Sequence, residues 1–263
     1  MRRLGVVGLV TLDRVDGGIP RLGGVPVYAA RALRLLGQPA IVATKLADED
    51  RPRLAGLGLP IVAESAPRTI EFRIENDGDG RRMAIDELGE PWNPEEARGW
   101  LARTLADADW VHCGALTRAD FPADTLAALA RGRVLSLDGQ GLVRRAELGD
   151  LVLDADYDPD VLRHVGVLKL AGEELDTLGL ELTESSLGSL GVREVVVTLG
   201  KTGAVVYADG LAEHVPTFPL EGIDPTGAGD SWMTAYLAYR RRRHSPVSAA
   251  RLANGVSGAI LAR

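Results

Sequence analysis

Residues 224–230 read Asp-Pro-Thr-Gly-Ala-Gly-Asp, and Ser-Trp-Met-Thr-Ala-Tyr-Leu follows at residues 231–237. The first seven residues are typical of a loop, and the apolar stretch behind them predicts a helix. A glycine-bearing loop therefore opens into a helix N-terminus, where backbone N–H groups lack intrahelical partners and the dipole is positive. Such an end binds phosphate, and glycines let the backbone approach the anion closely. Asp230 would lie in the first turn, where its carboxylate can take the proton of a hydroxyl held beside the phosphate.

This stretch resembles the C-terminal signature of the ribokinase-like (PfkB-type) carbohydrate kinases. The resemblance implies that Asp230 is the catalytic base and that the amides of Gly227, Ala228 and Gly229 hold the transferring phosphoryl group. It also implies an α/β fold, a three-layer sandwich with a mostly parallel central sheet and a small β lid. The alternative is a glycine-rich loop with an aspartate capping the start of a helix. The length of the matching stretch and the apolar helix behind it favour the kinase.

The composition is that of a globular protein with a full core. The chain has 263 residues, of which 46% are hydrophobic and 25% charged, so we expect a single kinase domain over residues 1–263. The net charge of −7 argues against nucleic acid as a main partner. One cysteine, Cys113, excludes an intrachain disulfide and fits a cytoplasmic location. No stretch approaches the roughly 18 apolar residues of a membrane helix.

Hydrophobic patterning predicts an alternation of strands and helices. Strands are expected over residues 4–10, 40–46, 61–64, 109–113, 133–137, 165–170, 194–199 and 204–208. Helices are expected over residues 26–36, 51–58, 93–105, 120–131, 173–178, 183–190 and 246–263, besides the one behind the 224–230 loop. The alternation predicts a parallel sheet with helices on both faces. Alternating residues on either side of Asn76 to Gly80 predict a hairpin. By the resemblance, segments at about 11–24 and 69–90 form a reduced lid.

The candidate acceptor site begins after the first strand. Asp13 lies at the carboxyl end of the sheet, where ligands bind in α/β folds, although an Asx turn is an equal alternative. Gly23 and Gly24 match the N-terminal glycine pair that lets the family's backbone approach the sugar. Tyr28 stands where many family members have Asn, so the resemblance leaves the substrate class open.

Two further strand ends carry polar residues. The segment Leu-Asp-x-Gln-Gly-x-x-Arg at residues 137–144 is similar to one in several ribokinase-type sugar and polyol kinases, which places Asp138 and Gln140 at the acceptor. A loop with a capping aspartate explains these residues equally well. In Lys-Leu-Ala-Gly-Glu-Glu at residues 169–174, Glu174 matches the glutamate that helps the family hold Mg²⁺ through water. Ala171 replaces the usual Asn, and a pair of first-turn acids on a helix is the alternative.

The candidate donor site involves two later segments. Thr-Leu-Gly-Lys-Thr-Gly at residues 198–203 resembles the family's nucleotide loop, which places Thr198, Gly200 and Gly203 near the phosphates or ribose of ATP. The same glycines suit a plain hairpin. In the last helix Asn254 is the candidate adenine contact, with helix packing as the alternative. Asp224 is a second candidate metal ligand, beside a monovalent cation as in some family members.

Together these motifs predict ATP- and Mg²⁺-dependent phosphorylation of a hydroxyl on a small sugar or polyol. Two alternatives remain: a nucleoside kinase of the same fold, and a ligand-binding regulator that has lost turnover. Ala171 favours the regulator, and the retained Asp230 argues against it. The G-x-G-x-x-G spacing of a dinucleotide-binding loop is absent after the first strand. The partners expected are the small molecule and, if the protein is not a monomer, a second copy bound through the lid.

Overall fold

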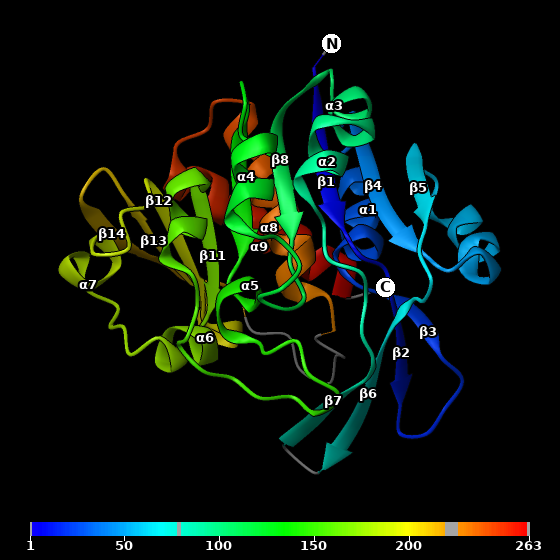
Figure 1. The fold of residues 1–263 in the computed structure, drawn as a ribbon. Helices are drawn as coiled ribbons and strands as arrows, with labels where there is room; N and C mark the ends of the chain where they lie inside the picture. The colour runs from blue at the N-terminus through cyan, green and yellow to red at the C-terminus, as the bar shows by residue number, and fades with distance from the viewer. Residues whose placement is uncertain (1, 78–79, 219–225, 262–263) are drawn as a thin grey trace.

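A large, mostly parallel sheet forms the centre of the molecule (Figure 1). The computed structural model describes the backbone of residues 2–77, 80–218 and 226–261. Over these ranges the sheet has nine strands in the order β14-β13-β12-β11-β9-β8-β1-β4-β5. Neighbouring strands are parallel from β12 through β5, and β13 and β14 add an antiparallel edge.

The central strands are apolar runs, as expected for a sheet covered on both faces. Their bounds are β1 (Arg3–Gly8), β4 (Ala40–Leu46), β5 (Ile61–Ser65), β8 (Ala108–Gly114), β9 (Val134–Asp138), β11 (Val167–Ala171), β12 (Glu194–Thr198), β13 (Ala204–Ala208) and β14 (Leu211–Val215). Every strand expected from the sequence is present, with ends shifted by up to two residues. Strand β14 was missed, although Asp209-Gly210 between β13 and β14 is a hairpin signal and both residues have positive φ.

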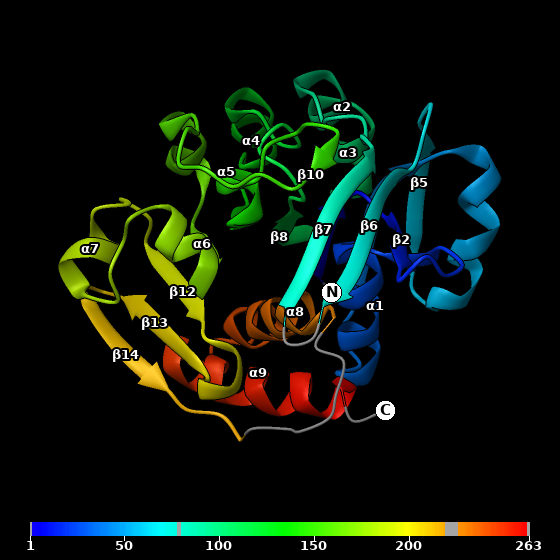
Figure 2. The same ribbon diagram turned by 90° about the horizontal axis from the view of Figure 1, so that it is seen from below.

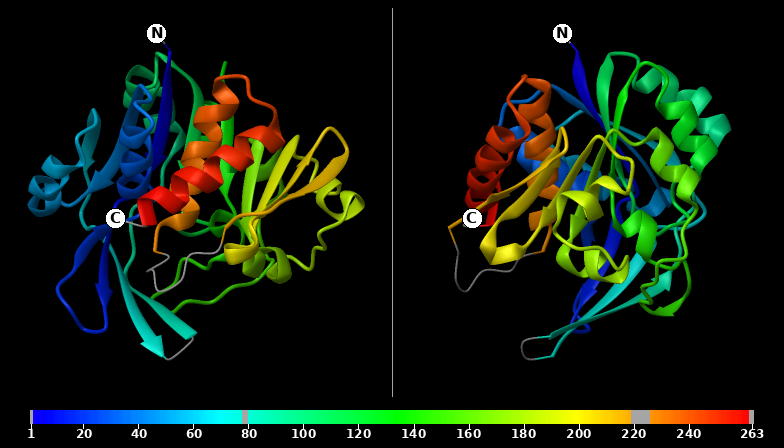
Figure 3. Two further views of the ribbon diagram at one scale, coloured as in Figure 1. Left: turned by 180° about the vertical axis from the view of Figure 1, so that it is seen from behind. Right: turned by 90° about the vertical axis from the view of Figure 1, so that its left-hand side faces the viewer.

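Helices cover both faces of the sheet and complete the three layers (Figure 3). One face carries α1 (Val25–Leu35), α8 (Ala228–Arg241) and α9 (Pro246–Leu261). The other face carries α2 (Pro94–Arg98), α3 (Trp100–Thr104), α4 (Ala123–Leu129), α6 (Gly172–Thr177) and α7 (Glu184–Gly188). Adjacent residues of β1 point to opposite layers, so Val6 packs with the first group and Val7 with the second. No helix within the described ranges is long and apolar enough to cross a membrane.

Two helical expectations differ from the structure. The helix predicted over residues 93–105 begins at the expected cap, where Asn93 and Glu96 form a capping box, but it is broken at Gly99. The φ of −90° and ψ of −108° at Gly99 are non-helical, so the chain continues as a separate α3. The helix predicted over residues 51–58 is a 3₁₀ segment, η1 (Asp48–Leu57). Pro52 lies inside it and has no N–H to donate to a helical ladder.

A second, smaller sheet lies at the carboxyl ends of the central strands (Figures 1 and 2). Its strands are ordered β10-β7-β6-β2-β3 and comprise β2 (Thr11–Val15), β3 (Arg21–Gly23), β6 (Ile70–Asp77), β7 (Gly80–Glu87) and β10 (Gly149–Asp150). The predicted hairpin is the antiparallel pair β6–β7. Strand β10 comes from a later part of the chain and was not expected. The small sheet thus takes strands from three separate segments.

Candidate active site

A cleft of about 800 Å³ opens between the small sheet and the carboxyl ends of the central strands. Loops after β9, β11 and β12 line it, together with the N-terminus of α8 and the inward face of the small sheet. The carboxyl ends of parallel strands are where ligands bind in α/β folds. Residues from distant parts of the sequence meet here, among them Asp13, Gln140, Arg144, Lys169, Glu174 and Asp230.

The N-terminus of α8 supplies an anion-binding backbone. Gly227 is the N-cap residue, with φ of +75° in the left-handed region. A Cβ there would overlap the ring of Tyr28, so both backbone conformation and space require glycine. The ladder of α8 starts with the Ser231 N–H, which donates to the Gly227 carbonyl at 3.0 Å. The preceding amides of Ala228, Gly229 and Asp230 therefore have no intrahelical acceptor, and the helix dipole adds positive potential.

Asp230 lies in the first turn of α8 and lines the cleft. Burial raises the pKa of this carboxyl to about 6, and the negative charge of Asp138 raises it further in the same direction. The positive charge of Lys169 acts against this rise without cancelling it. A carboxylate with a pKa near 6 is a stronger base than an ordinary aspartate and is still ionised at neutral pH.

Asp138 lies beneath the floor of the cleft, at the end of β9. The sequence placed it at the acceptor, but its side chain is 0% exposed and it does not line the cleft. Its carboxylate faces His112 Nε2 at 3.3 Å and Lys169 Nζ at 3.9 Å. Burial opposes ionisation, yet these two basic groups outweigh it and hold the pKa of Asp138 below its ordinary value. Asp138 therefore acts on Asp230 through its charge.

Two basic side chains line the cleft near the start of α8. Lys169 is only 3% exposed, and its Nζ would lie 3.3 Å from a Cβ placed on Gly229. Burial disfavours its charge, but Glu174, Asp138 and Asp230 outweigh burial and raise the pKa of Lys169. Burial lowers the pKa of the half-buried Arg144. These cations and the α8 amides without intrahelical acceptors together make this end of the cleft suited to phosphate.

The opposite end of the cleft is built around Asp13. Its carboxylate accepts a hydrogen bond of 2.6 Å from Thr11 Oγ1, and burial raises its pKa. A Cβ on Gly23 would overlap this carboxylate, so the glycine makes room for Asp13 and does not itself line the cleft. Gly24 lines the cleft with φ of +81°. Of the predicted glycine pair, Gly23 therefore packs against Asp13 and Gly24 forms part of the cleft wall.

The predicted metal and donor residues are only partly brought together. Glu174 lines the cleft, and its Oε2 accepts the Ala171 N–H at 2.8 Å. Thr198 and Gly200 also line the cleft, whereas Gly203 does not. Gly203 has φ of +107°, and a Cβ there would overlap the Val215 carbonyl. This glycine therefore serves the turn between two strands, as in the hairpin alternative. Among the described residues there is no cluster of three or more His, Cys, Asp and Glu side chains that could hold a metal ion by themselves.

Asn254 and Asp224 do not contribute to the cleft as described. The Asn254 carboxamide accepts a hydrogen bond from Trp232 Nε1 at 2.7 Å and donates to the Pro216 carbonyl at 2.9 Å. It joins α9 to α8 and does not line the cleft, so the packing alternative describes it better than the predicted adenine contact. Asp224 lies outside the described residues.

Sequence reasoning missed the role of Lys169. It belongs to the same segment as Glu174, but a single lysine within an apolar strand carries no motif of its own. One signal was available, because only three lysines occur in the whole chain and this one interrupts an apolar strand. The apolar cleft wall from the small sheet, formed by Phe72, Ile74 and Met83, was likewise beyond reach, since the face presented by each strand depends on the sheet's orientation.

Solved structures of ribokinase-family kinases share this fold. A pyrophosphate-dependent kinase of the ribokinase family in a sulfate complex is 26% identical, with a TM-score of 0.83 over 99% of this chain and 95% of that one. A pyrophosphate-dependent kinase of the same family, complexed with a pyrophosphate analog and myo-inositol, is also 26% identical, with a TM-score of 0.80 over 98% of this chain and 94% of that one. The model of the pfkB family carbohydrate kinases matches residues 21–263. The chain therefore belongs to this family.

Curated relatives include kinases with different substrates. Inositol 3-kinase of Zea mays is 32% identical over 139 residues, which are 53% of this chain and 34% of that enzyme. Fructokinase of Rhizobium leguminosarum bv. trifolii is 26% identical over 248 residues, or 84% of this chain and 72% of that enzyme. The chain thus spans about a third of the length of the inositol 3-kinase that it matches and most of the fructokinase.

Proposed function

We propose that this protein transfers a phosphoryl group to a hydroxyl of a small polyol. The observation that carries the proposal is Asp230, a carboxylate with a raised pKa in the first turn of α8. It lies in one cleft with two buried or half-buried cations, Lys169 and Arg144, and beside amides without intrahelical acceptors. A base and an anion site in contact with the same cleft are what phosphoryl transfer to an alcohol requires.

The reaction uses these groups in a single displacement. Asp230 takes the proton of the acceptor hydroxyl as its oxygen attacks the terminal phosphorus of the donor. The bond from that phosphorus to the bridging oxygen breaks, and the remainder of the donor leaves with the electron pair. The amides at the start of α8 and the Lys169 ammonium stabilise the negative charge on the transferring group. When bound, Mg²⁺ would neutralise charge on the donor phosphates, with Glu174 and Glu173 holding its waters at the cleft wall.

The cleft surface favours a ring-shaped polyol as acceptor. Phe72, Ile74 and Met83 of the small sheet form an apolar wall, which suits the C–H face of a ring. Asp13 and Gln140 offer acceptors and donors for its hydroxyls. The similarity to an inositol 3-kinase and to a kinase complexed with myo-inositol supports a cyclitol as the first acceptor to test. A nucleoside is the second candidate, supported by 33% identity over 75 residues to a nucleoside kinase of Methanothermobacter thermautotrophicus.

The donor is recognised through its phosphates, and both ATP and pyrophosphate have this chemistry. The sequence predicted ATP, and Thr198 and Gly200 in the cleft are compatible with it. However, Asn254, the expected adenine contact, is occupied by Trp232 and Pro216. The pyrophosphate-dependent kinases with 26% identity make pyrophosphate an equal candidate.

The test is phosphoester formation from Mg-ATP and from Mg-pyrophosphate, each against cyclitols, sugars and nucleosides. We expect one donor and one acceptor class to give turnover that Asp230→Asn lowers by about 10²- to 10⁴-fold. Asp124→Asn is the matched control, because Asp124 is also a first-turn aspartate but is exposed on α4. Turnover of nucleosides alone would favour the nucleoside kinase. Ligand binding without turnover by either donor would favour the non-catalytic regulator and contradict the proposal.

The outward face of the small sheet is charged, which favours a monomer over a dimer formed through this face. Residues alternate along β6, so Glu71 and Arg73 point away from the cleft while Phe72 points towards it. Ion pairs cover this face, including Arg14–Glu71 at 2.9 Å and Arg73–Asp86 at 3.4 Å. A dimer through this face would have to desolvate these charges, which is costly. Light scattering of the purified protein decides between the monomer and a dimer through the small sheet.

A further inference from the structure

Residues 145–154, here called the strap, connect the two ends of the cleft. The strap leaves the cleft after Arg144, and its β10 pairs with Ala84 and Ile85 of β7 (Figure 2). The Leu151 N–H donates to the Met83 carbonyl at 2.8 Å. The strap therefore begins beside a cationic residue at the phosphate end and docks beside a residue of the apolar acceptor wall, and both of these residues line the cleft.

The base of the strap is closed by backbone hydrogen bonds. The Arg145 N–H donates to the Val152 carbonyl at 3.0 Å, and the Asp154 N–H donates to the Val143 carbonyl at 3.0 Å. An isolated antiparallel bridge joins Arg144 to Leu153. The chain thus leaves the cleft and returns to it at the same place, so whatever fixes this base fixes the backbone of Arg144.

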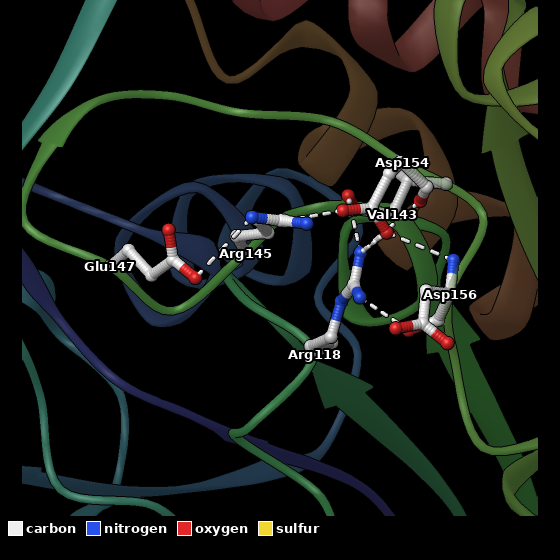
Figure 4. Close-up of polar contacts among 6 residues, drawn as sticks. All are labelled: Arg118, Val143, Arg145, Glu147, Asp154 and Asp156. Atoms are coloured by element: carbon white, nitrogen blue, oxygen red, sulfur yellow. Dashed lines mark hydrogen bonds and ion pairs between the residues drawn. The ribbon is translucent and has the colours of Figure 1, made fainter.

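Arg118 fastens this base from a neighbouring loop (Figure 4). Its backbone N–H donates to the Arg144 carbonyl at 2.9 Å. Its guanidinium donates to the carbonyls of Val143 and Asp154, each at 3.2 Å, and to the carbonyl of Asp156. The same guanidinium also binds the Asp154 carboxylate. One side chain therefore holds both strands of the base.

Asp154 completes the fastening from the strap side. Its carboxylate accepts hydrogen bonds from Arg118, from Arg145 Nε and from the Asp156 N–H (Figure 4). These bonds, first that from Arg118, hold the pKa of Asp154 well below its ordinary value. The Arg118 and Asp154 side chains are 20% and 26% exposed, so the pair is partly screened from solvent, and charge-assisted bonds of this kind are strong.

The outer part of the strap is held by few contacts: Leu151 packs against the core beside β7, but the residues on either side of it are exposed. Leu148 is 63% exposed, and β10 has only two residues. Pairing this short is marginal by itself. The strongest fastening of the strap is therefore at its base, where Arg118 and Asp154 hold it.

We propose that Arg118 and Asp154 are positioning residues of the active site: they fix Arg144 at the phosphate end and, through the strap, dock β10 against the acceptor wall. The proposal rests on the proposed kinase function for its kinetic consequences. Neither residue lines the cleft, so each acts through Arg144 and Met83. A small displacement of groups that hold donor and acceptor lowers the rate strongly, even when the change lies away from the reacting atoms.

The experiment compares Arg118→Ala, Arg118→Lys and Asp154→Asn in the full chain. We expect Arg118→Ala to raise the KM values for donor and acceptor together and to lower kcat/KM by about tenfold or more. Arg118→Lys should rescue only part of this loss, because an ammonium lacks the planar fork of donors that reaches several carbonyls. Asp154→Asn should act in the same direction more weakly. Because the two residues act as a unit, the double variant Arg118→Ala/Asp154→Asn should have the same kcat/KM as Arg118→Ala alone.

The matched control is Arg241→Ala. Arg241 pairs with Asp109 at 2.6 Å, with exposures of 12% and 25%, and it lies at the C-terminal end of α8, away from the cleft. This variant should lower Tm about as much as Arg118→Ala and leave both KM values within about threefold of wild type. Equal kinetic losses in the two variants would show that global destabilisation is responsible and would overturn the proposal.

Two readouts do not depend on turnover. Hydrogen exchange should accelerate over residues 145–156 and 80–87 in Arg118→Ala, with little change over β12. Calorimetry with pyrophosphate and with myo-inositol should show weaker binding of both. Unchanged exchange and binding in a folded Arg118→Ala protein would refute the positioning role even if the kinase assay succeeds. A wild-type protein without turnover would instead refute the proposed function, and exchange and binding would still decide the role of Arg118.

Discussion

Asp230→Asn is expected to lower turnover by about 10²- to 10⁴-fold and to make the folded protein more stable at neutral pH. The carboxyl has a pKa of about 6 in the folded state against an ordinary value of 3.8. The difference of roughly 2 pKa units corresponds to about 3 kcal/mol of free energy, at 1.36 kcal/mol per unit. Keeping this side chain ionised in the folded protein therefore costs about that much.

The pH dependence follows from the direction of the shift. Because the folded-state pKa of Asp230 is raised above the unfolded value, the folded state binds the proton more tightly between about pH 4 and pH 6. The stabilisation from this proton is present below about pH 4 and is lost as the pH rises through 6. An asparagine has no such dependence. At pH 7.5 the gain is therefore about 3 kcal/mol, because the folded-state pKa already includes the favourable effect of the helix dipole on the carboxylate.

The assay is urea unfolding of wild type and Asp230→Asn at pH 7.5 and pH 4. We expect the variant to be more stable by about 3 kcal/mol at pH 7.5, with the difference close to zero at pH 4. Asp124→Asn, the exposed first-turn aspartate of α4, should show no such gain. A variant that is less stable than wild type at pH 7.5, or equally stabilised at both pH values, would refute the assignment of a raised pKa to Asp230.

Three further outcomes follow from the same structure. In the wild-type pH profile, kcat/KM should fall about tenfold for each pH unit below 6 as Asp230 is protonated. Asp138→Asn should move this acidic limb of the profile to lower pH, because the charge of Asp138 helps to raise the pKa of Asp230. An unmoved limb would show that Asp138 does not influence the pKa of Asp230. Gly227→Ala should lower kcat/KM by about 10²-fold, because a Cβ at this left-handed position overlaps Tyr28 and displaces the start of α8; near-normal kinetics would contradict the anion site. Cys113 is fully buried, and burial raises the pKa of its thiol, so a thiol reagent should modify it only on unfolding; rapid labelling of the native protein would show that this strand end is open.

Local patterns in the sequence were sufficient for most of the elements. Strand β12 is a run of valines between a buried Glu194 and Thr198, and its environment on both faces of the sheet is apolar. The residues before α8 predict the start of a helix, because glycine, threonine and aspartate have distinct backbone preferences there. These signals depend on a few neighbouring residues, so they survive without knowledge of the fold.

The sequence was less informative where a residue's partner lies far along the chain. Strand β10 is a Gly-Asp pair with no pattern of its own, and it is a strand only because β7 lies beside it. The Asn254 carboxamide could equally have faced a nucleobase, but the folding of α9 against α8 gives it Trp232 as a partner. Pairing across the fold decided both positions.

The sequence by itself determined the chemical groups and the local backbone that presents them, including the Asp230 carboxylate and the amides at the start of α8. Only the tertiary structure decided their electrostatics. Asp138 and Asp230 both lie at the end of an element, yet Asp138 is held ionised by His112 and Lys169 beneath the floor of the cleft. The other has its pKa raised by burial and by its neighbour's charge. Coulomb energy and desolvation depend on distance and depth in space, and neither is written in the order of the residues.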